Sequence, residues 1–186
     1  MTARISTLLL IAVLTLSSGL VAAAFQAREH LTEQEIELVK DAQILDKRID
    51  VFIKAADRRM LVLNGTSPDP ATAKQLKKDS DSWGELPTGS RAELMADIAG
   101  IFDEAITNID DVSSRDEKNP LIPKALRKLA AAATRIVEQL KPAEAQAKGD
   151  AELSSFDQLA DNADAIIQAA SKLGPAPPAE KKGKKQ

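Results

Sequence analysis

The sequence predicts an all-α protein, an up-down-up-down four-helix bundle with a long first helix, preceded by a cleaved signal peptide. Aromatic residues make up 3% of the chain and tyrosine is absent, while alanine, leucine and charged residues dominate, a composition typical of closely packed helices. Long segments place apolar residues at alternating steps of three and four, and no stretch alternates at a period of two. Two of these segments begin with a capping box, a local pattern that starts a helix.

Residues 1–24 are typical of a secretory signal peptide. Arg4 supplies the positive start, an apolar segment follows, and residues 22–24 form an A-x-A cleavage site. Cleavage there leaves 162 residues that begin at Phe25, in an exported protein of the periplasm or the extracellular space. An uncleaved membrane anchor is the competing interpretation, because the uncharged stretch before Arg28 is long enough to cross a bilayer. Small residues before the cleavage site favour removal.

The first helix of the predicted domain (residues 25–174) covers residues 33–64. Thr32 and Glu35 form a capping box at its start, and Asn64-Gly65 is typical of a helix end. No proline or glycine interrupts it, so about 32 residues at 1.5 Å each predict a rod of roughly 48 Å. Its apolar seam is Leu38, Ala42, Leu45, Ile49, Phe52, Ala56 and Leu63, with Arg59 as the one polar interruption.

A second apolar row lies on a flank of this helix that the main seam leaves uncovered. The row consists of Ile44, Val51, Ala55 and Val62. Either the long connection that follows folds over it, with Trp83 and Leu86 as covering groups, or the row binds a protein partner or a second copy. These residues are the candidate partner surface.

Three further helices are predicted over residues 91–112, 123–141 and 150–173. The first has a capping box at Ser90, the second places Pro123 in its first turn, and Pro142 ends or kinks it. A short helix that starts at Pro70 interrupts the connection before them.

The helix at 91–112 carries a run of carboxylates on the face that we expect to point into solvent. These are Asp97, Asp103, Glu104, Asp110 and Asp111. A metal site is not favoured, because di-iron bundles need Glu-x-x-His pairs and the one histidine, His30, precedes the first helix. A solvated or lysine-paired surface explains these acids better.

The charge of the chain is unevenly distributed. The whole chain carries −3, whereas residues 25–179 sum to −7, because Arg4 contributes +1 to residues 1–24 and the last seven residues, with four lysines and one glutamate, contribute +3. A negative body disfavours nucleic acid as a partner. The lysine-rich tail, residues 175–186, has no apolar anchor, so we expect it to be disordered and to make at most a weak contact with an anionic membrane surface.

No motif in the sequence indicates an enzyme or a cofactor. Cysteine is absent, which excludes disulfides and C-x-x-C-H haem attachment, and neither a Gly-rich phosphate loop nor a G-x-S-x-G elbow occurs. We therefore expect a non-catalytic protein without cofactor or metal that binds a protein partner, as an interaction or scaffold module of the cell envelope.

The alternative is a periplasmic chaperone or stress-type protein that shields unfolded clients. The stretch Leu31-Thr32-Glu33-Gln34 resembles, over these few residues, the Leu-Thr-x-x-Gln motif of the small envelope chaperones related to Spy. The fifth position is Glu35 instead of glutamine, and the domain is acidic where those proteins tend to be basic cradles. The two functions differ in surface, since a chaperone needs an exposed apolar concavity and a scaffold needs one compact patch.

Overall fold

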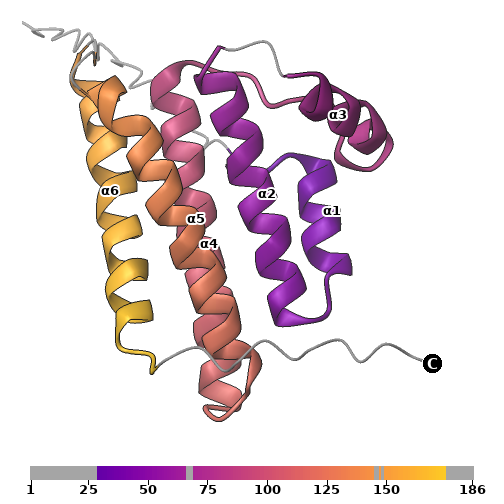
Figure 1. Cartoon of the computed structure of the whole chain (residues 1–186), viewed down its shortest axis with the longest axis vertical. Helices are drawn as coiled ribbons and strands as arrows, with labels where there is room; N and C mark the ends of the chain where they lie inside the picture. Colours follow the sequence, from indigo (N-terminus) through magenta and orange to yellow (C-terminus); the bar gives the residue numbers. More distant parts are fainter. Residues whose placement is uncertain (1–28, 66–68, 145–146, 148, 175–186) are drawn as a thin grey trace, which may run out of the picture.

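All the regular secondary structure in the described part of the chain is helical. A computed structural model describes residues 29–65, 69–144, 147 and 149–174 (Figure 1). Its helices are α1 (Glu33–Asp41), α2 (Leu45–Leu63), α3 (Pro70–Trp83), α4 (Arg91–Arg115), α5 (Leu121–Glu144) and α6 (Asp150–Ser171). The predicted all-α class is confirmed. The predicted signal peptide and lysine-rich tail lie outside the described residues.

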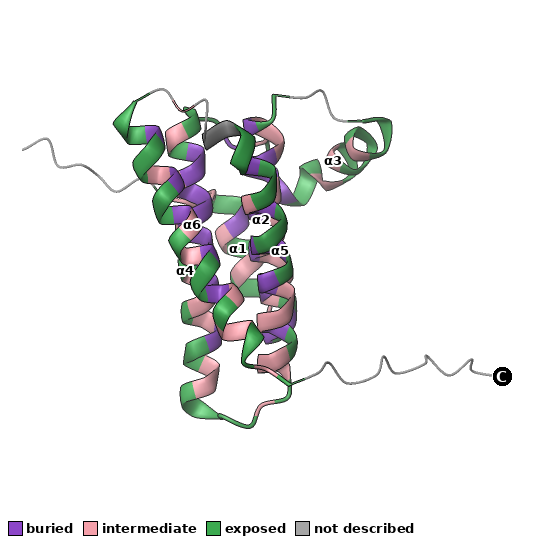
Figure 2. Ribbon diagram, turned by 60° about the vertical axis from the view of Figure 1, so that its left-hand side comes forward, coloured by how far each residue is buried: buried purple, intermediate pink, exposed green. Residues whose placement is uncertain are grey.

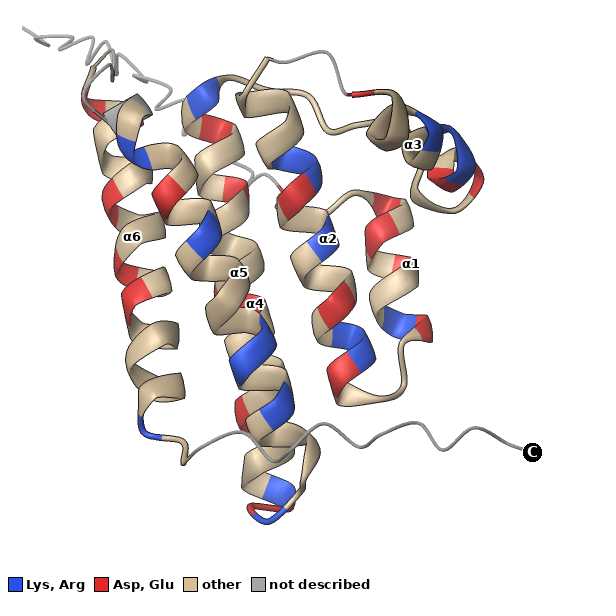
Figure 3. Ribbon diagram, in the orientation of Figure 1, with Lys and Arg blue, Asp and Glu red and all other residues tan. Residues whose placement is uncertain are grey.

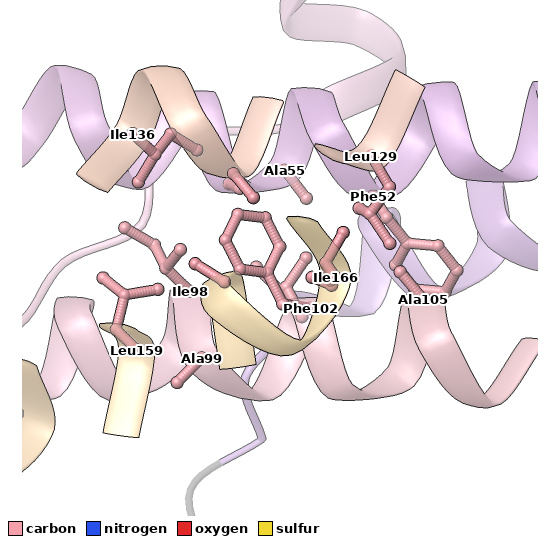
Figure 4. Packing of buried hydrophobic residues seen from close by; sticks show 14 of the residues in the cluster. Phe52, Ala55, Ile98, Ala99, Phe102, Ala105, Leu129, Ile136, Leu159 and Ile166 are labelled. Carbon is pink, nitrogen blue, oxygen red and sulfur yellow. The ribbon is translucent and has the colours of Figure 1, made fainter. Parts of the chain in front are cut away.

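The long helices α2, α4, α5 and α6 share one apolar core, and α1 and α3 lie on the outside of α2 (Figure 1). α2 packs against α4 and α5, and α6 packs against the same two helices. The largest fully buried apolar side chains are Phe52 of α2 and Phe102 of α4, both 0% exposed, which lie among smaller side chains such as Ala55 and Ala105 (Figure 4). Along each of the long helices, buried positions alternate with exposed ones, as expected for helices with one face in a core (Figure 2).

Side-chain pairs show which neighbouring helices run in the same direction. Asp46 and Asp57 of α2 contact Lys128 and Arg135 of α5 in the same order, so α2 and α5 are parallel. α4 and α6 are parallel as well, through the pairs Arg91–Glu152 and Ala99–Asn162. Successive long helices still alternate in direction, but two neighbouring pairs are parallel. One apolar stripe per helix does not specify which stripes meet, so the sequence could not show this arrangement.

The single helix predicted over residues 33–64 is wrong, because the segment forms α1 and α2 with a tight turn between them. Ala42 and Ile44 leave helical backbone, with ψ angles of 79° and 127°. The turn is held by side chains: Gln43 donates to the carbonyl of Lys40 at 2.7 Å, and Arg48 Nε donates to that of Ala42 at 3.0 Å. Polar contacts therefore end α1 without the proline or glycine that a sequence pattern would reveal.

The other helices begin close to their predicted positions and differ more at their ends. Asp69 caps α3 with Pro70 at its first position, and Ser90 caps α4 in a complete capping box, as predicted. α4 continues to Arg115, and α5 continues two residues past Pro142 to Glu144. A proline late in a helix disturbs only the preceding turn, so Pro142 does not mark the end.

Replacement of Phe52 by alanine should destabilise the protein by about 3 to 5 kcal/mol, because the change removes a fully buried ring and leaves a cavity. Urea unfolding followed by circular dichroism measures the effect. The control is Leu153→Ala on α6, whose side chain is largely exposed and whose loss should change stability by about 0.5 kcal/mol or less. Equal unfolding midpoints for the Phe52→Ala variant and the parent would contradict this placement of Phe52.

Candidate functional site

The structure separates the residues of the candidate partner surface. Ile44 is 54% exposed in the turn between α1 and α2, Val51 and Val62 are partly buried against the core, and Ala55 is fully buried. Figure 4 shows Ala55 among the core side chains. The four residues therefore do not form one exposed surface. Because α2 is contacted by α1, α4 and α5, this second apolar row is exposed at Ile44 and buried at Ala55.

The acidic residues of α4 also divide into two groups. Asp103, Asp110 and Asp111 are exposed, as expected. Asp97 is buried and Glu104 is half-buried, so the expectation that all of them point outward is wrong for these two. Both face the segment before α1, which folds back over α4 and was not expected there. Elsewhere, Figure 3 shows acidic and basic positions alternating along α2 and acidic positions along α6.

A buried ion cluster joins α1 to α2. One oxygen of Glu35, Oε1, accepts from Arg59 Nη1 at 2.7 Å and from Arg58 Nε at 3.2 Å. The other, Oε2, accepts from the backbone N–H of Thr32 at 3.0 Å. Glu35 is 0% exposed and the two arginine side chains are 1% and 3% exposed. The capping box predicted at Thr32 is thus present, and the same carboxylate binds two cations of the next helix.

Arg58 connects the cluster to the end of α3. Its Nη2 donates to the carbonyl oxygens of Trp83, the last residue of that helix, and of Gly84 and Glu85, which follow it. The buried Trp83 ring packs against cations, with Lys54 Nζ 4.4 Å and the Arg58 guanidinium 5.6 Å from its centre. Burial lowers the pKa of Arg58, yet an arginine remains charged at physiological pH. The buried Trp83 side chain therefore has a structural role, because it packs against Lys54 and Arg58 of α2.

Arg59 connects the cluster to α4 and to the segment before α1. Its Nη2 donates to the carbonyl of His30 at 2.7 Å. Its Nε has no hydrogen-bond partner among the described residues and lies 3.8 Å from Asp97 Oδ2. Two carboxylates, Glu35 and Asp97, therefore balance the charges of Arg58 and Arg59. The polar interruption that Arg59 makes in the apolar seam is the sequence feature that indicates this cluster.

His30 anchors the segment before α1 directly to α4. Its Nε2 lies 2.7 Å from Glu104 Oε2, and this hydrogen bond raises the pKa of His30 against the opposing effect of burial. The negative charges of Glu104, Asp97 and Glu29 raise it further. Gly100 makes room for the ring, since a Cβ atom there would lie 2.9 Å from His30 Cγ. The glycine thus leaves room for a histidine that comes from another segment.

A pocket of about 590 Å³ lies beside the ion cluster. Four parts of the chain line it: residues 29–34, residues 85–88 of the α3–α4 connection, Arg59 of α2 and Asp97 of α4. Its charged lining is Glu29, Glu85, Asp97 and Arg59. These residues lie far apart in the sequence and share no motif, so only the folded chain brings them together. Within the described ranges, no group of three or more acidic or histidine side chains could hold a metal ion.

No protein-family model matches this chain, and no curated protein and no solved structure is significantly similar to it. In the residues that the structure describes, no helix is both long and apolar enough to cross a bilayer.

Replacement of Glu35 by alanine should destabilise the protein by about 3 to 5 kcal/mol, because it leaves two buried arginines without their carboxylate. Chemical unfolding measures the loss. The matched control is Glu37→Ala, which removes an exposed ion pair with Lys40 on the same helix and should change stability by less than about 1 kcal/mol. Similar effects of the two substitutions would show that the cluster does not hold α1 in place.

The contact of His30 with Glu104 should make stability depend on pH. Because the folded state raises the pKa of His30, its contribution is complete below the unfolded value of 6.5 and is lost as pH rises through the raised folded value. The loss of unfolding free energy caused by His30→Gln should therefore be larger at about pH 5.5 than at about pH 9. Glu104→Gln should show the same trend. An equal loss at both pH values would contradict a charged contact.

Proposed function

We propose that this protein is an exported, non-catalytic interaction or scaffold module of the cell envelope. In this proposal the long helices form a four-helix bundle that acts as a rigid support. α1, α3 and the α3–α4 connection form the binding side, and the pocket beside Arg59 is the site that holds a protein partner. Export rests on the signal-peptide pattern of residues 1–24, as the sequence presents it.

The observation that carries the proposal is that the pocket is preorganised. Arg58 and Arg59 hold its walls through backbone carbonyls of His30 and of residues 83–85, and Glu35 holds both arginines. A concave site whose walls are already ordered loses little conformational entropy when it binds. Its volume also falls within the range of about 300 to 1,000 Å³ that is typical of ligand sites.

The surface of the described chain favours a specific partner over unfolded clients. Among the residues that the structure describes, the exposed large apolar side chains are Ile44 and Leu153. Ile44 lies in the α1–α2 turn and Leu153 in the first turn of α6, toward opposite ends of the molecule (Figure 1). Scattered single apolar residues are ordinary on a protein surface, whereas a client-shielding chaperone needs a contiguous apolar patch. The exposed large apolar side chains of the described residues therefore support the scaffold over the chaperone.

Site-directed photo-crosslinking in the native envelope tests the proposal. A crosslinking residue at Leu86, in the pocket wall, should capture one stoichiometric protein, and one at Asp164, on the exposed face of α6, should not. The intact mass of the recovered chain should correspond to a start at Phe25. A diverse set of partly unfolded proteins would support the chaperone instead, equal capture from both positions would contradict the proposed site, and a chain that retains Met1 would contradict cleavage.

A further inference from the structure

We infer that the pocket beside Arg59 binds an extended polypeptide segment that carries a lysine or arginine side chain, with the cation among the pocket carboxylates and a main-chain carbonyl on Arg59 Nε. This inference rests on the proposed function, because it names the chemistry of the partner at the same site. It follows from the charge of the lining, from one unpartnered buried donor and from the apolar part of the wall.

The charge of the lining selects a cation. Glu29, Glu85 and Asp97 come from three separate segments and converge on one pocket, whereas Arg59 is the single basic residue of the lining. The lining therefore carries three negative charges against the one positive charge of Arg59, whose Nε also lies 3.8 Å from Asp97 Oδ2. The pocket thus presents an excess of negative charge within a body that is itself acidic, residues 25–179 carrying −7. An anionic ligand would be repelled, and an ammonium or guanidinium group would be attracted.

The free donor of Arg59 adds a second requirement. Arg59 is 1% exposed, and its Nε has no hydrogen-bond acceptor among the described residues. A buried donor without an acceptor is unfavourable by about 1 to 3 kcal/mol, so a ligand that supplies one gains affinity. Because an anionic acceptor would meet the three carboxylates, a neutral carbonyl fits best. A polypeptide supplies a carbonyl and a basic side chain in one molecule.

The remaining wall accommodates the aliphatic part of such a side chain. Leu31, Leu86 and Pro87 contribute apolar surface to the same pocket. Lysine and arginine side chains pack their methylene groups along apolar surface while their charged ends reach polar groups. A simple amine would use the carboxylates alone, whereas a peptide would use the carboxylates, this apolar wall and Arg59 together.

Nuclear magnetic resonance of the full-length protein labelled with ¹⁵N tests the inference. The probes are the peptide acetyl-Ala-Lys-Ala-amide, the same peptide with glutamine in place of lysine, and n-butylamine. The lysine peptide should bind saturably, at least about tenfold more tightly than either other probe, and should shift the Arg59 Nε–H signal. The butylamine should leave that signal unchanged. No saturable binding of the lysine peptide, equal binding of the glutamine peptide, or an unmoved Arg59 signal would overturn the inference.

Matched variants locate the binding site. The double variant Glu29→Gln, Glu85→Gln should weaken binding of the lysine peptide about tenfold or more, because it removes two of the three carboxylates. The control Asp110→Asn, Asp111→Asn removes the same charge from exposed positions of α4 and should not change affinity. Equal affinities of the two double variants would overturn the inference. If crosslinking at Leu86 still captures one partner while the lysine peptide does not bind, the interaction function stands and the basic ligand class is wrong.

Discussion

The buried carboxylate of Glu35 is the group on which the outer part of this structure depends. It accepts hydrogen bonds from Arg58, Arg59 and the backbone of Thr32, and its arginine partners reach residues 83–85 and His30 in turn. A charge removed from water is tolerated only when it is paired and hydrogen-bonded, so each of these segments must stay where its partner requires. One side chain thereby positions α1, the end of α3 and the segment before α1.

The polar cluster and the apolar core stabilise different parts of the molecule. The core around Phe52 and Phe102 holds α2, α4, α5 and α6 together through non-directional burial. The cluster holds α1 and the α3–α4 connection through directional hydrogen bonds, which orient their partners more narrowly than apolar contact does. This combination gives a packed apolar core with a polar pocket on one side.

The contacts of Arg59 within the cluster also keep its Nε apart from Asp97, although the two side chains carry opposite charges. Arg59 is held from one side by Glu35 and the carbonyls of Ala55 and His30, so its Nε remains 3.8 Å from Asp97. The two groups lie close enough to lower the energy of both buried charges, yet they form no direct hydrogen bond at that distance. The pocket therefore offers a donor and an excess of acidic groups at the same time.

The sequence by itself determined the helical class, the capping boxes at Thr32 and Ser90, and the core positions from Leu45 to Leu63, because these depend on local backbone chemistry and on periodicity. It did not determine the break at Ala42, the parallel neighbours or the pocket. The break is held by Gln43 and Arg48, and it allows Glu35 to meet Arg58 and Arg59, 23 and 24 residues away. The pocket depends on segments that are distant in the sequence. Only the tertiary structure decides such contacts, because the energy that stabilises them exists only once the chain has folded back on itself.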